Sequence, residues 1–328
     1  MASQSTDSND LAAYGADTIA KGSKSFAMAS LLFEPSMREN AQLLYAWCRY
    51  CDDVIDGQDL GDDAPDPSID QAAHRERLKV LRYHTERSIA GEDVSIPAFQ
   101  AFGSVIRTTR IPHRFPFALL DGFAMDVERQ EITTDEDLMQ YCYGVAGVVG
   151  VMMAIIMGVE PNDEETLERA CDLGLAFQLT NICRDVIDDA RGSRVYLPSH
   201  RLKDVGVSPT PESIMKPENR TAVFEVAADL LALADSYYLS ATQGVKRLPL
   251  RAGAAILAAR DIYKAIGEKL LSEGPKAWDE RISISSTRKA GYAARAFFSI
   301  GGRMFENRNA QFSPRPNLWS GPIGSEHR

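Results

Sequence analysis

Two acidic segments of the chain share one layout that could hold metal ions and phosphate groups. The first reads YAWCRYCDDVID, residues 45–56, and the second reads QLTNICRDVIDDA, residues 178–190. In a helix, the spacing of the first segment puts four polar side chains on one face: Tyr45, Arg49, Asp52 and Asp56. The same face of the second segment carries Gln178, Asn181, Asp185 and either Asp188 or Asp189.

In both segments an apolar stripe lies one residue away from the polar face, which is a rotation of about 100° around the helix. The acids therefore stand at the border of the buried face, where they can point into an internal cavity. Like charges one turn apart destabilise a helix by about 0.2–0.5 kcal/mol per pair, and partial burial adds a desolvation cost. A solvated acidic face is the simpler reading of one such run, but two copies with the same offset and a neighbouring arginine (Arg49, Arg184) argue against it.

Hard divalent cations remove this difficulty. Mg²⁺ prefers carboxylate, water and phosphate oxygens and commonly binds one or two side chains together with its substrate. Two acidic faces across a cavity therefore predict a diphosphate site in which metal ions join the protein to the phosphates.

The elements that must position these faces are helices. Apolar residues recur at steps of three and four through 37–55, 71–90, 218–244, 248–271 and 287–310, and the only short alternating run is RISIS at 281–285. No internal repeat and no long linker divides the 328 residues. We expect one all-α domain over residues 9–312, a disordered N-terminus over 1–8 and a flexible proline-rich tail over 313–328.

The charge and cysteine content argue against a nucleic-acid-binding protein and against a secreted, disulfide-bonded one. A net charge of −10 argues against a nucleic-acid partner. The polar opening MASQSTDSND is not a signal peptide, and five cysteines in a chain of this size do not indicate a disulfide framework. We therefore expect a cytoplasmic protein. Cys48 and Cys51 form a CxxC pair, but they lie on the apolar stripe and are expected to be buried thiols.

One apolar run could be mistaken for a membrane span. Residues 142–159 read CYGVAGVVGVMMAIIMGV without a charge, which is at the lower limit of length for crossing a bilayer. Acidic flanks favour a buried core helix instead. Gly144, Gly147 and Gly150 follow at steps of three, which would let another helix or a substrate chain approach closely. The acidic stretch Asp59–Asp70 contains helix breakers and is expected to be a solvated loop.

Taken together, these segments resemble the squalene and phytoene synthase family, in its bacterial carotenoid-pathway type. The resemblance is carried by GSKSF (22–26), LLYAWCRYCDDVID (43–56), GFAMDVE (122–128), YCYGVAGVVG (141–150), ACDLGLAFQLTNICRDVIDDA (170–190) and RVYLP (194–198). It implies an isoprenoid synthase helical bundle around a central cavity. It also implies that Mg²⁺, with Mn²⁺ as a substitute, is bound by Asp52, Asp56, Asn181, Asp185 and Asp189.

The resemblance further implies roles for other residues. Ser25, Arg49 and Arg184 would contact phosphate oxygens, and the reaction chamber would be lined by Tyr45, Tyr141, Gln178 and Tyr196. The implied reaction joins two geranylgeranyl diphosphates head to head through a cyclopropyl diphosphate intermediate to phytoene. No NADPH is expected, since no dinucleotide fingerprint occurs. Peripheral membrane contact is expected because substrate and product are long lipids, and the oligomeric state stays open.

Three alternatives to phytoene formation are considered. Joining two C15 substrates to squalene or dehydrosqualene is the main one, because cavity depth sets chain length and cannot be read from the sequence. Head-to-tail elongation is disfavoured, since GQDLGDD follows Asp56 where paired arginines are typical. A non-catalytic relative would be expected to lose the metal-binding acids, and both sets are intact.

Overall fold

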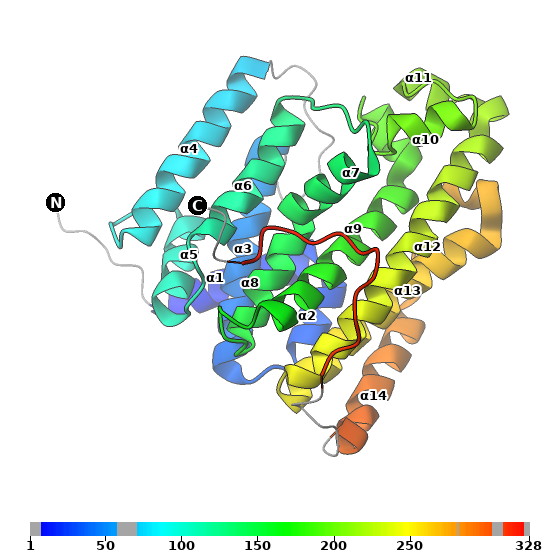
Figure 1. The fold of residues 1–328 in the computed structure, drawn as a ribbon. Coiled ribbons are helices and arrows are strands. Elements are labelled where there is room, and N and C mark those ends of the chain that lie inside the picture. The colour runs from blue at the N-terminus through cyan, green and yellow to red at the C-terminus, as the bar shows by residue number, and fades with distance from the viewer. Residues whose placement is uncertain (1–7, 58–70, 281, 304–310, 325–328) are drawn as a thin grey trace.

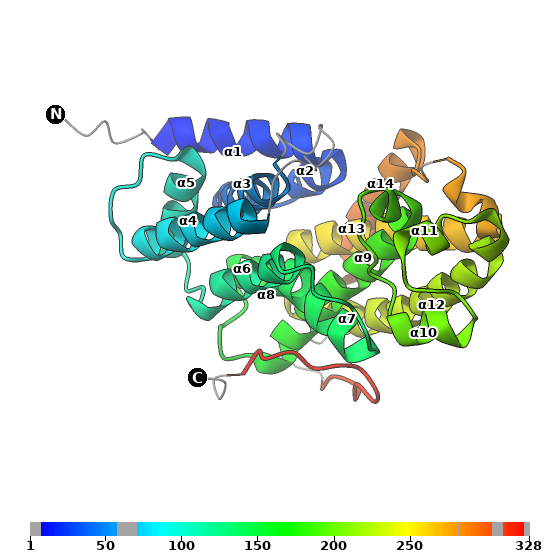
Figure 2. The same ribbon diagram turned by 90° about the horizontal axis from the view of Figure 1, so that it is seen from above.

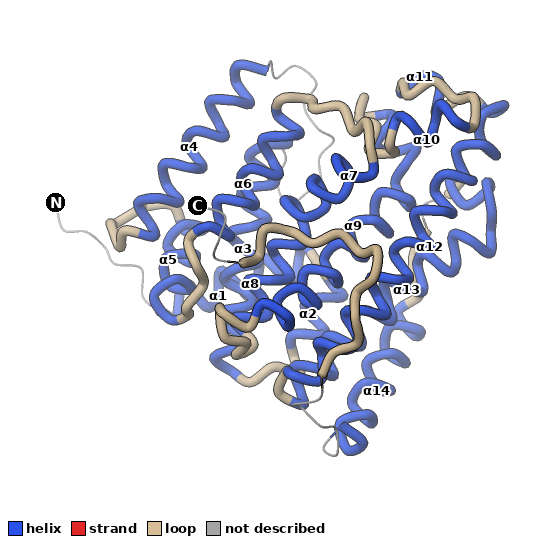
Figure 3. Tube along the Cα trace, viewed as in Figure 1, coloured by secondary structure: helices blue, strands red, loops and turns tan. Residues whose placement is uncertain are grey.

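The computed structural model describes residues 8–57, 71–280, 282–303 and 311–324, apart from the side chains of residues 8, 24, 25 and 299–303. These residues form helices joined by loops, and none of them lies in a strand (Figure 3). The α-helices are α1 Ser8–Gly22, α2 Lys24–Ser30, α3 Pro35–Asp56, α4 Gln71–Ile89, α5 Pro97–Thr108, α6 Arg114–Val127, α7 Asp135–Cys142, α8 Val148–Ile156, α9 Glu164–Arg191, α10 Ser199–Asp204, α11 Pro211–Ile214, α12 Arg220–Gly244, α13 Leu250–Glu273 and α14 Ser286–Arg303. The predicted all-α fold is confirmed.

The two helices that carry the acidic faces have clear local signals at their ends. Helix α3 begins with Pro35, which is compatible with a first turn because its missing N–H has no partner there. It ends at Gly57, whose left-handed φ of 69° is a glycine conformation. Helix α9 is preceded by Asp163, whose side chain accepts a hydrogen bond from the Thr166 backbone N–H. Asp56 therefore occupies the last turn of α3.

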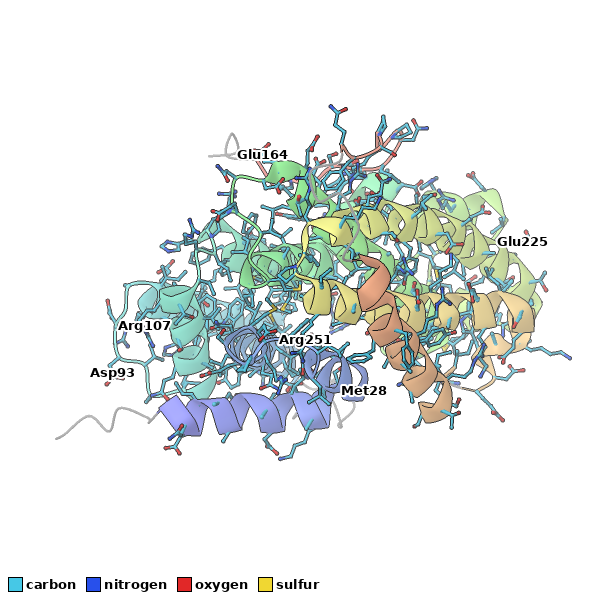
Figure 4. The ribbon with its side chains drawn as sticks, turned by 90° about the horizontal axis from the view of Figure 1, so that it is seen from below. Met28, Asp93, Arg107, Glu164, Glu225 and Arg251 are labelled. Atoms are coloured by element: carbon cyan, nitrogen blue, oxygen red, sulfur yellow. The ribbon has the colours of Figure 1, made fainter. Side chains whose placement is uncertain are left out.

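Helix α9 forms the centre of the bundle (Figures 1 and 2). Helix α12 runs along it, α8 packs on it from another side, and α13 also contacts it. Helix α3 packs against α1 and α5, while α2 contacts α13, as Figure 4 shows where Met28 of α2 lies near the α13 turn that carries Arg251. One continuous apolar core connects these helices, from Leu11 in α1 to Ile323.

The apolar segment 142–159 is buried within this core, as predicted. Asp135–Ile156 is a continuous helical stretch whose length and composition would suit a membrane span, yet 72% of its apolar window is buried inside the protein. The stretch joins α7 to α8 through one π-helical turn, η1, at Tyr143–Gly147. Such turns are rare and often occur next to functional sites.

The glycines of this segment allow close approach of other helices, which confirms that prediction. A Cβ on Gly144 would stand 2.6 Å from the Cα of Gly122 in α6. A Cβ on Gly150 would stand 2.4 Å from the carbonyl oxygen of Ala170 in α9, and one on Gly174 would stand 2.4 Å from the carbonyl oxygen of Ala146. Because the contacted atoms belong to backbone, no side-chain rotation can relieve these contacts.

We expect the substitution Gly144→Ala to lower the free energy of unfolding by about 1–3 kcal/mol, because the added methyl group forces α6 and η1 apart. Urea denaturation followed by circular dichroism measures this loss. Gly291→Ala in α14 is the matched control, since a Cβ there meets nothing within 4 Å. The control should be neutral or stabilising by up to about 1 kcal/mol. Equal stability of the two variants would contradict this packing.

The chain ends differ from the sequence prediction. Helix α1 already begins at Ser8, and residues 1–7 lie outside the described residues, as do residues 325–328 and the whole of the predicted loop Asp59–Asp70. Residues 311–324 run across the helices as an extended segment, and residues 313–324 of it fall in the predicted flexible tail over 313–328 (Figure 1). We call this segment the C-terminal strap. It is held because Ile323 is buried and Arg315 pairs with Asp172 of α9, a contact between distant residues that composition does not reveal.

Candidate active site

A cavity of about 510 Å³ lies inside the bundle. Its body is lined mainly by apolar side chains from α6, η1, α8, α9 and α13, including Leu119, Phe123, Val145, Val149, Met153, Leu173, Phe177, Ile256 and Tyr263. Polar and charged side chains also reach it, and many of them belong to the two predicted faces. The cavity thus has the composition needed for a long hydrocarbon with a charged end.

The first acidic face lines this cavity as predicted. Tyr45, Arg49, Asp52 and Asp56 all belong to its wall. The Arg49 guanidinium lies 3.2 Å from the Asp52 carboxylate and donates a hydrogen bond of 2.6 Å to Asp53. Asp53 is the next residue along the helix and does not belong to the predicted polar face. Its side chain is buried beside Arg49.

The second face is divided. Gln178 and Asn181 line the cavity, whereas Arg184 and Asp185 do not. The Arg184 guanidinium instead donates hydrogen bonds to both carboxylate oxygens of Asp185. The last two acids, neither of which is in the cavity wall, differ in exposure. Asp188 is exposed and pairs with Arg191 at 2.8 Å, while Asp189 is half-buried.

Two residues that the sequence did not single out connect the faces. Asp126 of α6 lines the cavity and accepts hydrogen bonds from Tyr196 at 2.7 Å and Tyr141 at 3.1 Å. Arg194, in the loop after α9, donates a hydrogen bond of 2.7 Å to Asp56. Both lie in segments that carry the family resemblance, GFAMDVE and RVYLP, but neither belongs to an acidic stripe that would have marked it.

Other predicted residues lie beside the cavity. Tyr141 lines the cavity, as predicted, but Tyr196 does not. Tyr196 instead stacks on Tyr141, with ring centroids 4.8 Å apart. The Ser25 side chain lies outside the described part of the structure, and Ser23, which caps α2, lines the cavity. Cys48 and Cys51 are free thiols; Cys51 is buried, as predicted, whereas Cys48 is half-buried and lines the cavity.

Burial makes the acids of this region hard to ionise. The pKa of Asp52 is raised to about 7, first by desolvation, with Asp56, Asp53 and Asp126 adding to the rise and Arg49 opposing it. Its side chain keeps 42% of its surface accessible, but Asp52 is part of the cavity wall, so we attribute this surface to the cavity.

Asp189 behaves in the same way. Desolvation and then Asp185 raise its pKa to about 8, Asp126 adds to the rise, and Arg194 opposes it. Desolvation also raises the pKa of Asp126, against the charge of Arg194. The carboxylates of α3, α6 and α9 therefore lie close enough to raise one another's pKa values. The positive charge of Arg194 lies among them and opposes this rise for Asp126 and Asp189.

Helix direction adds to the same cost. Asp52 and Asp56 stand in the last two turns of α3, and Asp185 and Asp189 in the last two turns of α9. The negative end of the helix dipole disfavours an acid there by about 0.3–1 kcal/mol. Both pairs are therefore placed where added positive charge stabilises them.

The residues present fit a divalent cation that is completed by substrate. The Asn181 Oδ1 atom is buried at the cavity wall and has no hydrogen-bond partner among the described residues, so it offers a ligand oxygen. Nowhere in the described part of the chain do three acidic, histidine or cysteine side chains cluster into a closed metal site. An open site of this kind suits an ion that takes one or two carboxylates and fills its shell with phosphate and water.

We expect binding of a divalent cation to release protons near neutral pH. Asp52 and Asp189, with pKa values of about 7 and 8, are partly protonated there and must ionise to bind metal. Calorimetric titration with Mn²⁺ in two buffers of different ionisation enthalpy measures the release. It should be clear at about pH 7 and small at about pH 9, where both groups are already ionised.

The same raised pKa values make the stability of the metal-free protein depend on pH. Because both pKa values lie above the ordinary value of 3.8, the folded state binds more protons than the unfolded state. These groups therefore contribute stability that increases as the pH falls from about 8 towards about 4. A titration without buffer dependence at about pH 7 would show that the two acids are already ionised, in contradiction to their burial.

Comparison with known proteins identifies the family of the chain. The squalene/phytoene synthase family model matches residues 19–288. The chain is 45% identical over 311 residues to the 15-cis-phytoene synthase of Pantoea ananas, covering 94% of this chain and 97% of that protein. It is 44% identical over 299 residues to the 15-cis-phytoene synthase of a Paracoccus species, covering 90% of this chain and 91% of that protein.

Solved structures give the same fold. A dehydrosqualene synthase in complex with a ligand superposes with a TM-score of 0.77 at 23% identity, over 90% of this chain and 98% of that one. A squalene synthase from Alicyclobacillus acidocaldarius gives a TM-score of 0.66 at 22% identity, over 82% and 97%. These likenesses show an isoprenoid synthase helical fold. By the family match and its similarity to these relatives, the chain belongs to the squalene/phytoene synthase family.

Proposed function

We propose that this chain is a 15-cis-phytoene synthase, a prenyltransferase that joins two geranylgeranyl diphosphates head to head and releases two diphosphates. The observation that carries the proposal is the cavity, in which the acids and the unpartnered Asn181 oxygen stand beside a long apolar wall. The relatives at 44–45% identity over most of the chain bear this name. Family members act on prenyl diphosphates and generally depend on a divalent metal.

The polar end of the cavity binds the diphosphates. Asp52, Asp56 and Asn181, with Asp185 and Asp189 further along α9, are the residues that would hold Mg²⁺, for which Mn²⁺ can substitute. When bound, the metal supplies positive charge to the diphosphate and so stabilises it as a leaving group. Arg49 lines the cavity and can turn from its carboxylate partners to phosphate oxygens, where a guanidinium binds well. We assign the same role to Arg184 and Ser25.

The proposed reaction has two ionisations. Departure of one diphosphate with its bonding electrons leaves an allylic cation, and the double bond of the second substrate attacks it. Loss of a proton closes a cyclopropane ring that still carries the second diphosphate. Departure of that diphosphate, rearrangement and loss of another proton leave the central double bond. No external reductant enters this sequence, so no NADPH is required.

The cavity body protects the cations. Its apolar side chains exclude water, which would otherwise capture a carbocation. Tyr45, Phe177 and Tyr263 present aromatic rings to the chamber, and the last two stack with centroids 4.1 Å apart. An aromatic face stabilises a nearby cation by about 0.5–2 kcal/mol. The rings therefore favour the charged intermediates without reacting with them.

Potential nucleophiles in the wall are kept neutral. Desolvation raises the pKa of the Cys48 thiol far above its ordinary range, with the Asp52 charge adding to the rise. Desolvation likewise raises the pKa of Tyr45 to about 12, although Arg49 opposes it. A thiolate or a phenolate at these positions would be alkylated by a prenyl cation, so burial of these groups protects the enzyme from its own intermediates.

Incubation with C15 and C20 prenyl diphosphates in the presence of Mg²⁺, followed by mass analysis of the hydrocarbon, tests the proposal. We expect a C40 product from geranylgeranyl diphosphate, formed without NADPH. Exclusive formation of a C30 product would replace phytoene formation by the squalene-type or dehydrosqualene-type reaction. Failure to form any hydrocarbon from either substrate would contradict a synthase function.

A further inference from the structure

The cavity has a second end, far from the acidic faces. Its wall follows one stripe of α9 that ends at Thr166: Asn181, Gln178, Phe177, Gly174, Leu173, Ala170, Arg169 and Thr166. Fifteen residues separate the two ends of this stripe, which corresponds to about 22 Å along a helix. A prenyl tail whose diphosphate lies near Asn181 must therefore point towards Arg169.

Arg169 is an unusual residue for this place. Its side chain is only 5% exposed, it lines the cavity, and its Nε has no hydrogen-bond partner among the described residues. Nη1 donates to the Ser240 hydroxyl of α12, and Nη2 donates to the Ser313 carbonyl of the strap at 2.6 Å. Gly244 makes room for its stem, since a Cβ there would stand 2.4 Å from the Arg169 Cβ. The guanidinium is thus fixed from two sides at the end of an apolar chamber.

The C-terminal strap anchors this arrangement. Arg315 binds the fully buried Asp172 through two nitrogens, with Nε at 2.9 Å, and the Ser240 hydroxyl donates to the same carboxylate. The ring of Phe312 lies 5.4 Å from the Arg169 guanidinium. Arg169 and Arg315 thus share a network with one buried acid.

Further contacts hold the strap along its length. The Trp319 backbone N–H donates to the Tyr237 hydroxyl at 3.0 Å, and the Ile323 carbonyl accepts from Arg114 at 2.9 Å. Figures 1 and 2 show the strap, in red, crossing the bundle, and Glu164 at the start of α9 lies beneath its end (Figure 4). The strap is therefore fixed to α6, α9 and α12, the last two of which also form the far end of the cavity.

We propose that Arg169, held by the C-terminal strap, is the stop against which the far end of a prenyl tail rests, so that this residue selects tail length. The inference rests on the proposed function. A longer tail would have to displace a guanidinium whose bonds to Ser240 and Ser313 cannot be replaced by contacts with hydrocarbon. A shorter tail reaches less far along the wall and loses apolar contact. The strap thereby acts on specificity through Arg169 without touching the reacting atoms.

Prenyl diphosphates of 15, 20 and 25 carbons, with Mg²⁺, test this role. We expect the wild-type kcat/KM to be at least about tenfold higher for the C20 than for the C25 substrate. Arg169→Ala should reduce that ratio by about tenfold, because the variant opens the far end of the cavity to the longer tail. Calorimetric Kd values for non-hydrolysable C20 and C25 analogues should shift in parallel.

Arg247→Ala is the matched control. Its guanidinium stacks on the same Phe312 at 4.9 Å but does not line the cavity, so this variant should keep the wild-type ratio. Arg315→Lys, which weakens the strap and leaves Arg169 in place, should shift the ratio in the same direction by a smaller factor. It also tests the inference if Arg169→Ala does not fold.

The outcomes separate the inference from the proposed function. Equal wild-type kcat/KM values for the C20 and C25 substrates would contradict the proposed role of Arg169, and so would an unchanged C20/C25 ratio in Arg169→Ala. Neither result would affect the proposed function if C40 product still forms. Absence of C40 product from the wild type would instead overturn the proposed function. A ratio changed as strongly by Arg247→Ala as by Arg169→Ala would show a general loosening of the fold and would also overturn the stop.

Discussion

Replacing Asp52 or Asp185 by asparagine should lower turnover by a factor of about 10²–10³, while the helical fold stays intact. Each substitution keeps the shape of the side chain but removes one negative charge from the faces proposed to hold the metal. Asp52 lines the cavity, and Asp185 lies one turn beyond Asn181 on α9. Product formation at saturating Mg²⁺ measures the loss, and circular dichroism reports the fold.

Asp188→Asn is the control for this pair. Asp188 belongs to the same acidic run but is exposed and pairs with Arg191 at the surface. Its replacement should leave turnover within about twofold of the wild type, because an exposed ion pair contributes little. Near-normal activity of either Asp52→Asn or Asp185→Asn would refute the role assigned to that acid.

Arg194→Gln should destabilise the metal-free protein by about 3 kcal/mol, because it leaves several partly buried carboxylates without their internal cation. Arg194 donates to Asp56, and its charge opposes the raised pKa values of Asp126 and Asp189. Urea denaturation of the metal-free variant measures the loss. Addition of Mg²⁺ should recover part of it, since a bound cation then supplies the missing positive charge.

Arg191→Gln is the matched arginine. It pairs at 2.8 Å with the exposed Asp188, and its loss should change the free energy of unfolding by less than about 1 kcal/mol. Equal stability of Arg194→Gln and wild type would show that Arg194 does not neutralise the acids. A loss that Mg²⁺ leaves unchanged would show that the metal binds elsewhere.

Much of the fold and of the site could be predicted from the sequence, because both rest on helical periodicity. The apolar stripes predicted the long helices, and the polar stripe offset by one residue predicted that Asp52 and Asp56 reach an internal cavity. Gly144 and Gly150 indicated close helix contacts. These features are local, since a few turns of helix are enough to show them.

The missed features depend on contacts between distant parts of the chain. Asp126 belongs to no acidic stripe on α6, and its importance comes from Tyr141 and Tyr196, which only the fold brings to it. Arg194 likewise meets Asp56 across 138 positions. No periodic pattern marks such residues, although both stand in segments that carry the family resemblance.

The strap illustrates the same limit. A segment rich in proline and glycine has the composition of a flexible tail. It is ordered because Arg315 binds the buried Asp172 and because Ile323 enters the core. Sequence composition describes how freely a segment can move alone, whereas these contacts depend on partners more than 100 residues away.

We propose that the two acidic faces at the polar end of the cavity hold diphosphate through divalent cations. The most direct test is a crystal structure of the full chain with Mn²⁺ and a non-hydrolysable geranylgeranyl diphosphate analogue, in which anomalous scattering locates the metal. We predict metal peaks that join the diphosphate to Asp52 and Asp56 on one side and to Asn181, Asp185 or Asp189 on the other. Metal bound elsewhere, with these side chains turned outward into solvent, would contradict the claim.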